Sequence, residues 1–295
     1  MMNVRMNFNF MKWRSHAIIL SLILCALSLG LVMFRGLNLG IDFTGGNVVQ
    51  IEFDTRPDVG EVREVVSAVV AREAMIQDFG ERGIMIRTSE ETDESRQQLI
   101  NVLRDRYPEM TLLGFEQVGP TVGQELRIQA LWALMAALGG ILIYITVRFQ
   151  FRFAVVSVGP LIHDALLTLG FFSLMQMEIS SSFIAAILTI VGYSLNNEII
   201  ILDRIRENWK DLEKVGIVEL VNTSINQTLS RTLNTTLTMI FPIIALCVWG
   251  GPVLATFSYA MLVGIVVGTY SSLMLTTGFV VEWWLRRPPE GTKKR

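Results

Sequence analysis

The sequence has few of the residues that metal, redox and hydrolytic chemistry requires. Its 295 residues include two cysteines and two histidines, too few for a disulfide framework or a His-rich metal site. Cys25 and Cys247 lie inside apolar runs, which favours buried small side chains over a disulfide. Walker-type loops and CxxC, GxSxG and HExxH motifs are all missing. We therefore expect a protein that is not an enzyme and that needs no cofactor or metal ion.

Charge is also scarce outside one region. Lys and Arg number 25 and Asp and Glu 27, and just over half of these charged residues fall within 35–127. The rest of the chain contains apolar runs of about 20 residues, the length that crosses a bilayer. This pattern predicts an α-helical integral membrane protein with one sizeable soluble insertion, in contact with lipid and with no nucleic-acid partner.

The apolar runs predict six transmembrane helices. We expect them at 17–34, 128–147, 153–175, 182–202, 231–249 and 253–283, with a charged amphipathic segment at 203–230 and short ends at 1–16 and 284–295. Lys and Arg outside the insertion lie in the two ends, in 148–152 and in 204–231. Six crossings place all of these on one side. The positive-inside rule then predicts cytoplasmic termini and a periplasmic insertion.

The insertion, residues 35–127, alternates between strand-like and helix-like patterns. It opens with a glycine-rich turn at 40–46, where glycines permit positive φ. Alternation and spacing predict strands at 47–53, 75–79, 84–88 and 110–118 and helices at 57–72 and 93–107. The order βαββαβ is that of a small ferredoxin-like α+β domain. In the last crossing, Ala260, Gly264 and Gly268 form a stripe of small residues, which is typical of close helix packing.

The stretch 181–208 is an apolar run whose last part carries amides and a carboxyl. Thr189, Tyr193, Asn196 and Asn197 share one helical face, because they lie at i, i+4, i+7 and i+8. Polar groups inside a membrane are costly, so they usually face a bundle interior or a water-filled path. We expect Asn196 and Asn197 either to line a proton path or to stabilise helix packing through hydrogen bonds to neighbouring helices.

Three charged residues near these amides each have two interpretations. Asp164, near the middle of the third crossing, is either a proton-carrying carboxyl or a neutral acid that fixes packing. Glu198 either takes a direct part or snorkels to the surface. Arg231 opens the fifth crossing, where it either meets Asn197 or Glu198 or serves as a membrane anchor. A further charged group is most simply a solvated surface helix that could dock a partner: Asp203, Arg204, Arg206 and Glu207.

Six short motifs, spread in order along the chain, resemble those of the SecF family, subunits of the bacterial SecD–SecF complex. They are Gly40-Ile-Asp-Phe-Thr-Gly-Gly46, Val118-Gly-Pro-Thr-Val-Gly-Gln-Glu-Leu126, His163-Asp164, Gly192-Tyr-Ser-Leu-Asn196, Asp203-Arg-Ile-Arg-Glu-Asn208 and Ser230-Arg-Thr-Leu-Asn-Thr235. The resemblance implies structural roles for Gly40, Asp42, Gly45, Gly46, Gly119, Pro120, Gly192 and Tyr193. It also adds His163 to the proton-coupling candidates Asp164, Asn196, Asn197, Glu198 and Arg231.

This resemblance implies a particular architecture and activity. The fold would be a six-helix half of a resistance-nodulation-division (RND) type transporter, paired obligately with SecD in the bacterial inner membrane. The pair would use the proton-motive force to help the SecYEG channel complete the export of unfolded preproteins, with YajC as a further partner.

The sequence departs from the family pattern at one position. The family usually reads Gly-Tyr-Ser-x-Asn-Asp in this helix, and that Asp is implicated in proton passage together with the fifth-helix arginine. Here Asn197 stands in its place, followed by Glu198, whereas Arg231 is kept. Either Glu198 takes over, or a carboxylate of SecD suffices, or this chain is impaired in proton coupling. We favour the SecD carboxylate, since Glu198 lies about 100° further round the helix.

Two other functions stay open. A small-molecule exporter half of the same superfamily would usually carry larger external domains than one of roughly 80 residues. A purely structural scaffold for SecD or SecYEG would need no proton site, and Asn197 strengthens this alternative.

Overall fold

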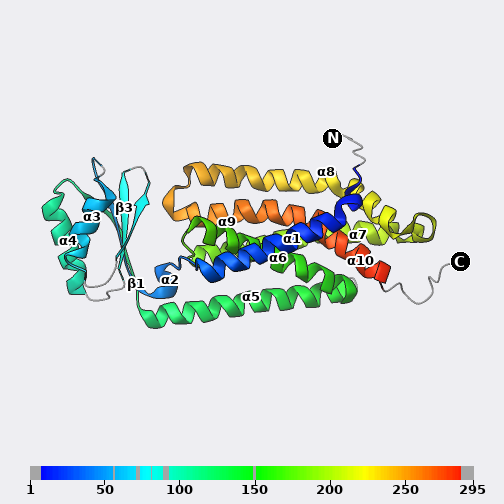
Figure 1. Ribbon diagram of the computed structural model, residues 1–295, viewed down its shortest axis with the longest axis horizontal. Coiled ribbons are helices and arrows are strands. Elements are labelled where there is room, and N and C mark those ends of the chain that lie inside the picture. Colours follow the sequence, from blue (N-terminus) through cyan, green and yellow to red (C-terminus); the bar gives the residue numbers. More distant parts are fainter. Residues whose placement is uncertain are drawn as a thin grey trace.

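The computed structural model describes residues 8–55, 57–70, 74–80, 82–88, 93–148 and 151–286. Figure 1 shows a bundle of long helices with a small α+β domain at one end, which we call the domain end. Helix α1 begins and helix α10 ends at the opposite end of the bundle, which we call the terminal end (Figure 1).

Long helices make up the bundle. They are α1 (Arg14–Phe34), α5 (Pro120–Arg148), α6 (Phe151–Met175), α7 (Ser181–Glu207), α8 (Leu212–Trp249) and α9 (Gly251–Tyr270), which continues through the π-helical η3 (Ser271–Thr276) into α10 (Thr277–Arg286). Among the described residues, five helical stretches are long and apolar enough to cross a membrane, and one of them runs through both α7 and α8. This agrees with the expected multi-pass membrane protein, and the count of six crossings stays a prediction.

The segment predicted as an amphipathic linker, 203–230, is part of the bundle. It forms the end of α7, the 3-10 turn η2 (Asn208–Asp211) and the first half of α8, which bends at Gly216 (φ 77°). The apolar side chains of Ile217, Leu220 and Ile225 are buried at helical spacing against the bundle. The continuous helix that contains the predicted fifth crossing therefore begins just after Gly216, well before residue 231.

The α+β domain contains the predicted order of elements. These are β1 (Gly46–Glu52), α3 (Val59–Ser67), β2 (Met75–Phe79), β3 (Gly83–Thr88), α4 (Asp93–Arg106) and β4 (Thr111–Val118). The sheet order is β2-β3-β1-β4, and all neighbouring strands are antiparallel. Alternate residues of β1 and β3, such as Val49 and Ile86, join Val62 and Leu103 of the helices in one buried apolar core.

A backbone bridge joins the domain to the bundle. The N–H of Gly40 donates to the carbonyl of Ile179 at 2.8 Å, and the N–H of Ile179 donates to the carbonyl of Asn38 at 2.8 Å. The chain that enters the domain is thus paired with the loop between α6 and α7. Beside this bridge, the Asp42 carboxylate accepts a hydrogen bond of 2.7 Å from the N–H of Ser181.

An ion pair reinforces the same joint. Arg87 of β3 pairs with Glu178 of the α6–α7 loop. Burial raises the pKa of Glu178 above its ordinary value, and the neighbouring Arg87 guanidinium opposes that rise. The loop between α6 and α7 is therefore joined to the sheet by an ion pair as well as by backbone hydrogen bonds.

Glycines allow the short helix α2 (Ile41–Thr44) to lie against α5. Gly45 and Gly46 have φ angles of 71° and 121°, which only glycine adopts readily. A Cβ on Gly123 would come within 3.0 Å of the backbone nitrogen of Gly45. The glycines of the first two motifs thus permit one close contact between the domain's first turn and the start of α5.

The predicted small-residue stripe is where α9 meets α7. Ala260 is fully buried, and Gly264 and Gly268 lie directly against the side chains of Ile190 and Ser194 of α7, with no room for a Cβ. Close packing by small residues is a principal source of helix association in membranes. This contact brings the polar parts of α7 and η3 together.

Gly45→Ala should destabilise the protein, because alanine is strained at a φ of 71° with ψ at 169°. We expect a loss of about 1–3 kcal/mol, measured by thermal unfolding in detergent. Gly139→Ala is the matched control, since Gly139 lies in a helix with no atom near its added Cβ. Equal melting temperatures for the two variants would contradict this interpretation of the turn.

Candidate functional site

A polar layer divides the apolar core of the bundle. On the domain side, one buried apolar cluster includes Phe183 and Ile190 of α7, and on the terminal side a second includes Ile201 and Leu202. Between the two clusters, fully buried polar side chains come from α6, α7 and η3. They are Asp164, Ser194, Asn197, Glu198, Ser271, Ser272 and Thr276. A membrane protein that keeps such a layer in its interior has a candidate functional site there.

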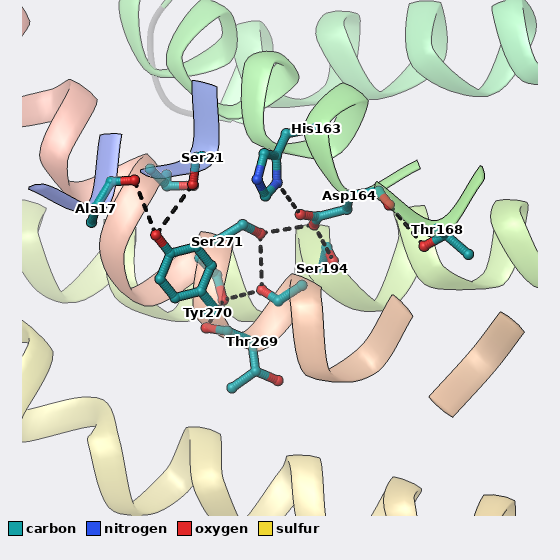
Figure 2. A network of polar contacts seen from close by, with 12 residues as sticks. Ala17, Ser21, His163, Asp164, Thr168, Ser194, Thr269, Tyr270 and Ser271 are labelled. Carbon is teal, nitrogen blue, oxygen red and sulfur yellow. Dashed lines mark hydrogen bonds and ion pairs between the residues drawn. The ribbon is translucent and has the colours of Figure 1, made fainter. Parts of the chain in front are cut away.

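Asp164 is the centre of this layer (Figure 2). It is 0% exposed, and its Oδ2 accepts hydrogen bonds of 2.8 Å from the hydroxyls of Ser194 and Ser271. Its Oδ1 lies 3.0 Å from Nδ1 of His163, which precedes it on α6. Within the described residues, no Lys or Arg forms an ion pair with this carboxyl. The site therefore surrounds a carboxyl with hydroxyls and one imidazole.

Local geometry explains why these hydroxyls reach Asp164. A π-helical turn at η3 shifts the register of the last helix, and such turns occur often at functional sites. The turn lets Ser271 bond to Asp164 while Tyr270 donates to the carbonyl of Ala17 on α1 at 3.0 Å (Figure 2). Because Gly268 has no side chain, Ser194 fits between α7 and α9.

Glu198 is a second carboxyl in the same layer. It is 0% exposed, and its Oε1 accepts a hydrogen bond of 2.8 Å from Thr276. Its Oε2 has no hydrogen-bond partner in the described structure. The expectation that Glu198 could snorkel to the surface is therefore wrong, because its side chain is directed toward η3 in the interior.

Asn197 lies on a different side of α7 from Glu198. One turn before it, Tyr193 donates a 2.8 Å hydrogen bond to Thr236 of α8, and Thr236 lies 3.1 Å from the hydroxyl of Thr269. Asn197, one turn after Tyr193, is fully buried. Neither of its amide atoms has a hydrogen-bond partner among the described residues. Thr232, one turn before Thr236, is also buried without a partner.

The predicted polar face of α7 is split by the fold. Tyr193 and Asn197 are buried, whereas Thr189 and Asn196 are on the outer surface of the bundle. Arg231 is exposed too, and where the chain is described it contacts neither Asn197 nor Glu198, so the expected contact is absent. The neighbouring Thr232 is the residue turned toward the interior, and one helical step of about 100° then points Arg231 outward.

The charged group in the last turns of α7 links α5, α7 and α8 at the terminal end. Arg148 of α5 lies 3.5 Å from Asp203, and Arg204 donates to Gln227 of α8 at 2.7 Å and pairs with Glu207 at 2.6 Å. Arg206 donates to the carbonyl of Arg148 at 3.4 Å. These residues are partly exposed, as the solvated-helix interpretation requires, but their partners lie within this chain.

Sequence reasoning found the two carboxyls and missed their hydroxyl partners. Ser194 lies inside a quoted motif without a role, and Ser271 and Thr276 received none. The available signal was a concentration of hydroxyl residues at 269–277, inside an otherwise apolar crossing. Groups of metal-ligating residues (three or more His, Cys, Asp or Glu) do not occur among the described residues.

Comparisons with known proteins agree with this architecture. The family model "Protein export membrane protein SecD/SecF, C-terminal" matches residues 98–286, and "SecD/SecF GG Motif" matches residues 30–55. Protein translocase subunit SecF of Desulfurispirillum indicum is 43% identical over 93% of this chain and 91% of its own. SecF of Pseudomonas aeruginosa is 39% identical over 98% and 95%.

Solved structures give the same result. The crystal structure of SecDF from Thermus thermophilus, titled a translocon-associated membrane protein, matches with a TM-score of 0.91 and 41% identity. A second SecDF structure, in a super-membrane-facing form, matches with a TM-score of 0.74 and 41% identity. In both cases 97% of this chain is covered, and it spans 40% of the solved chain.

The bundle, its outer domain and these likenesses define a multi-pass membrane component of protein export. The chain belongs to the SecD/SecF protein-export membrane family, as a SecF member.

Ser194→Ala and Ser271→Ala should each destabilise the protein by about 1–3 kcal/mol, because each leaves a buried carboxyl short of one donor. Thermal unfolding of purified protein in detergent measures the loss. Ser258→Ala is the matched control, since the Ser258 hydroxyl is equally buried but has no partner in the described structure. If all three variants melt together, the hydrogen bonds to Asp164 do not hold the layer.

Proposed function

We propose that this chain is a non-enzymatic SecF-type subunit that, with SecD, couples proton movement across the membrane to late steps of preprotein export through SecYEG. The observation that carries this proposal is the position of Asp164: fully buried, served by two hydroxyls and without an ion-pairing Lys or Arg among the described residues. Carboxyls at this depth are costly and typically mark proton relays.

The partners of Asp164 suit a group that gains and loses a proton. A serine hydroxyl can donate to a carboxylate or accept from a carboxylic acid, so Ser194 and Ser271 can satisfy Asp164 in either state. His163 adds a second titratable group at 3.0 Å. A change of charge would alter how strongly α6 holds α7 and η3, since the three elements meet at this carboxyl.

The joint between bundle and domain supports transmission of such a change. Helix α6 ends and helix α7 begins at the loop that bonds to Asn38 and Gly40. The first residue of α7, Ser181, bonds to Asp42. The same loop carries Glu178, the partner of Arg87. In this proposal, movement of α6 against α7 tilts the domain, which holds an emerging preprotein and prevents it from sliding back.

The exposed polar residues on the membrane-spanning helices support pairing with SecD. Thr189, Asn196, Arg231 and Asn234 lie on the outer surface of α7 and α8. Polar groups that faced lipid would be costly, so a protein partner should cover them. The Thermus thermophilus relative is a SecDF, of which this chain spans 40%. We therefore assign this surface to SecD, and Arg231 would act there rather than inside this chain.

The remaining parts of the proposal concern topology. Counting α7 and α8 separately gives six crossings of the bacterial inner membrane, with both termini cytoplasmic and the domain, whose strand order is ferredoxin-like, in the periplasm. YajC and unfolded preprotein would be further partners of the assembled complex.

A structural scaffold is the alternative that one observation favours. Asn197 has no titratable group at the position where the family usually has an aspartate. A scaffold would need Asp164 only for packing, so a neutral isostere there would preserve its activity. The next experiment separates the two functions.

Asp164→Asn should abolish the proton-dependent part of export. We expect the rate of proton-dependent export to fall about a hundredfold. The measurement is a preprotein chase in cells depleted of SecD and SecF and supplied with cognate SecD plus the variant. The matched control, Asp211→Asn, changes a carboxyl of η2 that is not buried and should export normally. Unchanged export by Asp164→Asn, with normal assembly, would establish the scaffold instead.

A further inference from the structure

The mechanism so far uses one of the two carboxyls in the polar layer. Glu198 is equally buried, yet Thr276 is its only hydrogen-bond partner in the described structure and Oε2 has none. A glutamine would fill the same space without placing an ionisable group inside the membrane, where it is costly. Packing alone therefore does not account for a glutamate here.

The same two elements, α7 and η3, position both carboxyls. Ser194, the partner of Asp164, lies one turn before Glu198 on α7, a rise of about 6 Å. On η3, Ser271 bonds to Asp164 and Thr276, five residues later, bonds to Glu198. Glu198 is thus the next acidic group from Asp164 toward the terminal end.

Unpartnered polar atoms mark a track along these carboxyls. The hydroxyl of Ser157 lies two turns from Asp164 on α6 toward the terminal end, and it faces the Glu198 carboxyl. Ser157 Oγ, Glu198 Oε2 and His163 Nε2 are all buried without a partner in the described part of the chain. Buried polar atoms of this kind are the ones that ordered water satisfies.

No described Lys or Arg side chain forms an ion pair with Asp164 or Glu198. His163 lies beside Asp164, Thr276 of η3 bonds to Glu198, and none of the described Lys or Arg residues forms a hydrogen bond or ion pair with either carboxyl. An ion pair would fix the charge of a carboxyl, whereas hydroxyls and water leave it free to exchange a proton.

We propose that Glu198 is the second proton carrier and forms with Asp164 a two-carboxyl relay toward the terminal end. Protonated Asp164 gives its proton through a bridging water to the Glu198 carboxylate. Asp164 is left as a carboxylate that Ser194 and Ser271 stabilise, and neutral Glu198 then releases the proton past Ser157. This inference rests on the proposed proton-coupled function. It assigns the part of the missing family carboxyl to Glu198, since Asn197 follows Tyr193, which bonds to α8, by one turn and makes no hydrogen bond to Asp164 in the described structure.

The first test is Glu198→Gln in the same export assay. The amide keeps the shape and can still accept from Thr276, and we expect proton-dependent export to fall about tenfold or more. Glu213→Gln, at an exposed carboxyl near the start of α8, is the matched control and should export normally. The double variant Asp164→Asn/Glu198→Gln should export no less than Asp164→Asn alone, because both residues act in one path.

Position within the layer can be tested by moving the carboxyl. Adding Asn197→Asp to Glu198→Gln should not restore export, because residue 197 follows Tyr193, which bonds to α8, by one turn and makes no hydrogen bond to Asp164 or to its partners in the described structure. Restoration by Asn197→Asp would overturn the relay as drawn.

The outcomes separate this inference from the proposed function. If Glu198→Gln exports normally while Asp164→Asn does not, the relay is wrong and the proposed function stands. If both variants export normally, the relay and the proposed function are both wrong. Should Glu198→Gln fail to assemble, dicyclohexylcarbodiimide, which modifies protonated carboxyls in apolar surroundings, is applied to the unaltered complex. We expect an adduct on Glu198, found by mass spectrometry, with parallel loss of export. An unmodified Glu198, or export that survives its complete modification, overturns the inference.

Discussion

The structure depends on one constraint: a carboxyl buried in a membrane bundle must receive its hydrogen bonds from the chain around it. Asp164 obtains two of them from Ser194 and Ser271, which lie on separate elements. Those contacts require α7 and α9 to approach closely, which Gly264 and Gly268 allow, and they require the π-helical register of η3. The small-residue stripe, the π turn and the polar layer are therefore parts of a single arrangement.

The same arrangement links the interior of the bundle to the α+β domain. Helices α6 and α7 carry the two carboxyls and meet at the loop that pairs with Asn38 and Gly40. A domain attached by a flexible linker would not sense a rearrangement in the bundle, whereas one joined by backbone hydrogen bonds and an ion pair would.

Much of the fold could be predicted from sequence because its signals are periodic. Long apolar runs indicated the membrane helices, and the alternating patterns at 47–53 and 84–88 indicated strands that the structure contains as β1 and β3. The site was harder, since a helical face predicts which residues share a side but not what covers that side. Asn196 and Asn197 are neighbours in sequence, yet the bundle buries Asn197 and leaves Asn196 exposed. Glu198 is near enough to the end of its apolar run for snorkelling by sequence alone, but in the fold it is buried and bonds to Thr276. Helix packing, which depends on the whole bundle, decides these cases.

Proton transfer through Asp164 is the step on which the proposed function depends. The most direct measurement is proton flux into liposomes that contain the complex of this chain with its cognate SecD, followed by a pH-sensitive dye trapped inside, under an imposed proton-motive force. The account predicts a flux that Asp164→Asn reduces to the level of liposomes without protein, while Asp211→Asn leaves it unchanged. Equal flux through the Asp164→Asn complex and the unaltered complex would contradict the account, and the polar layer would then be only a structural contact between helices.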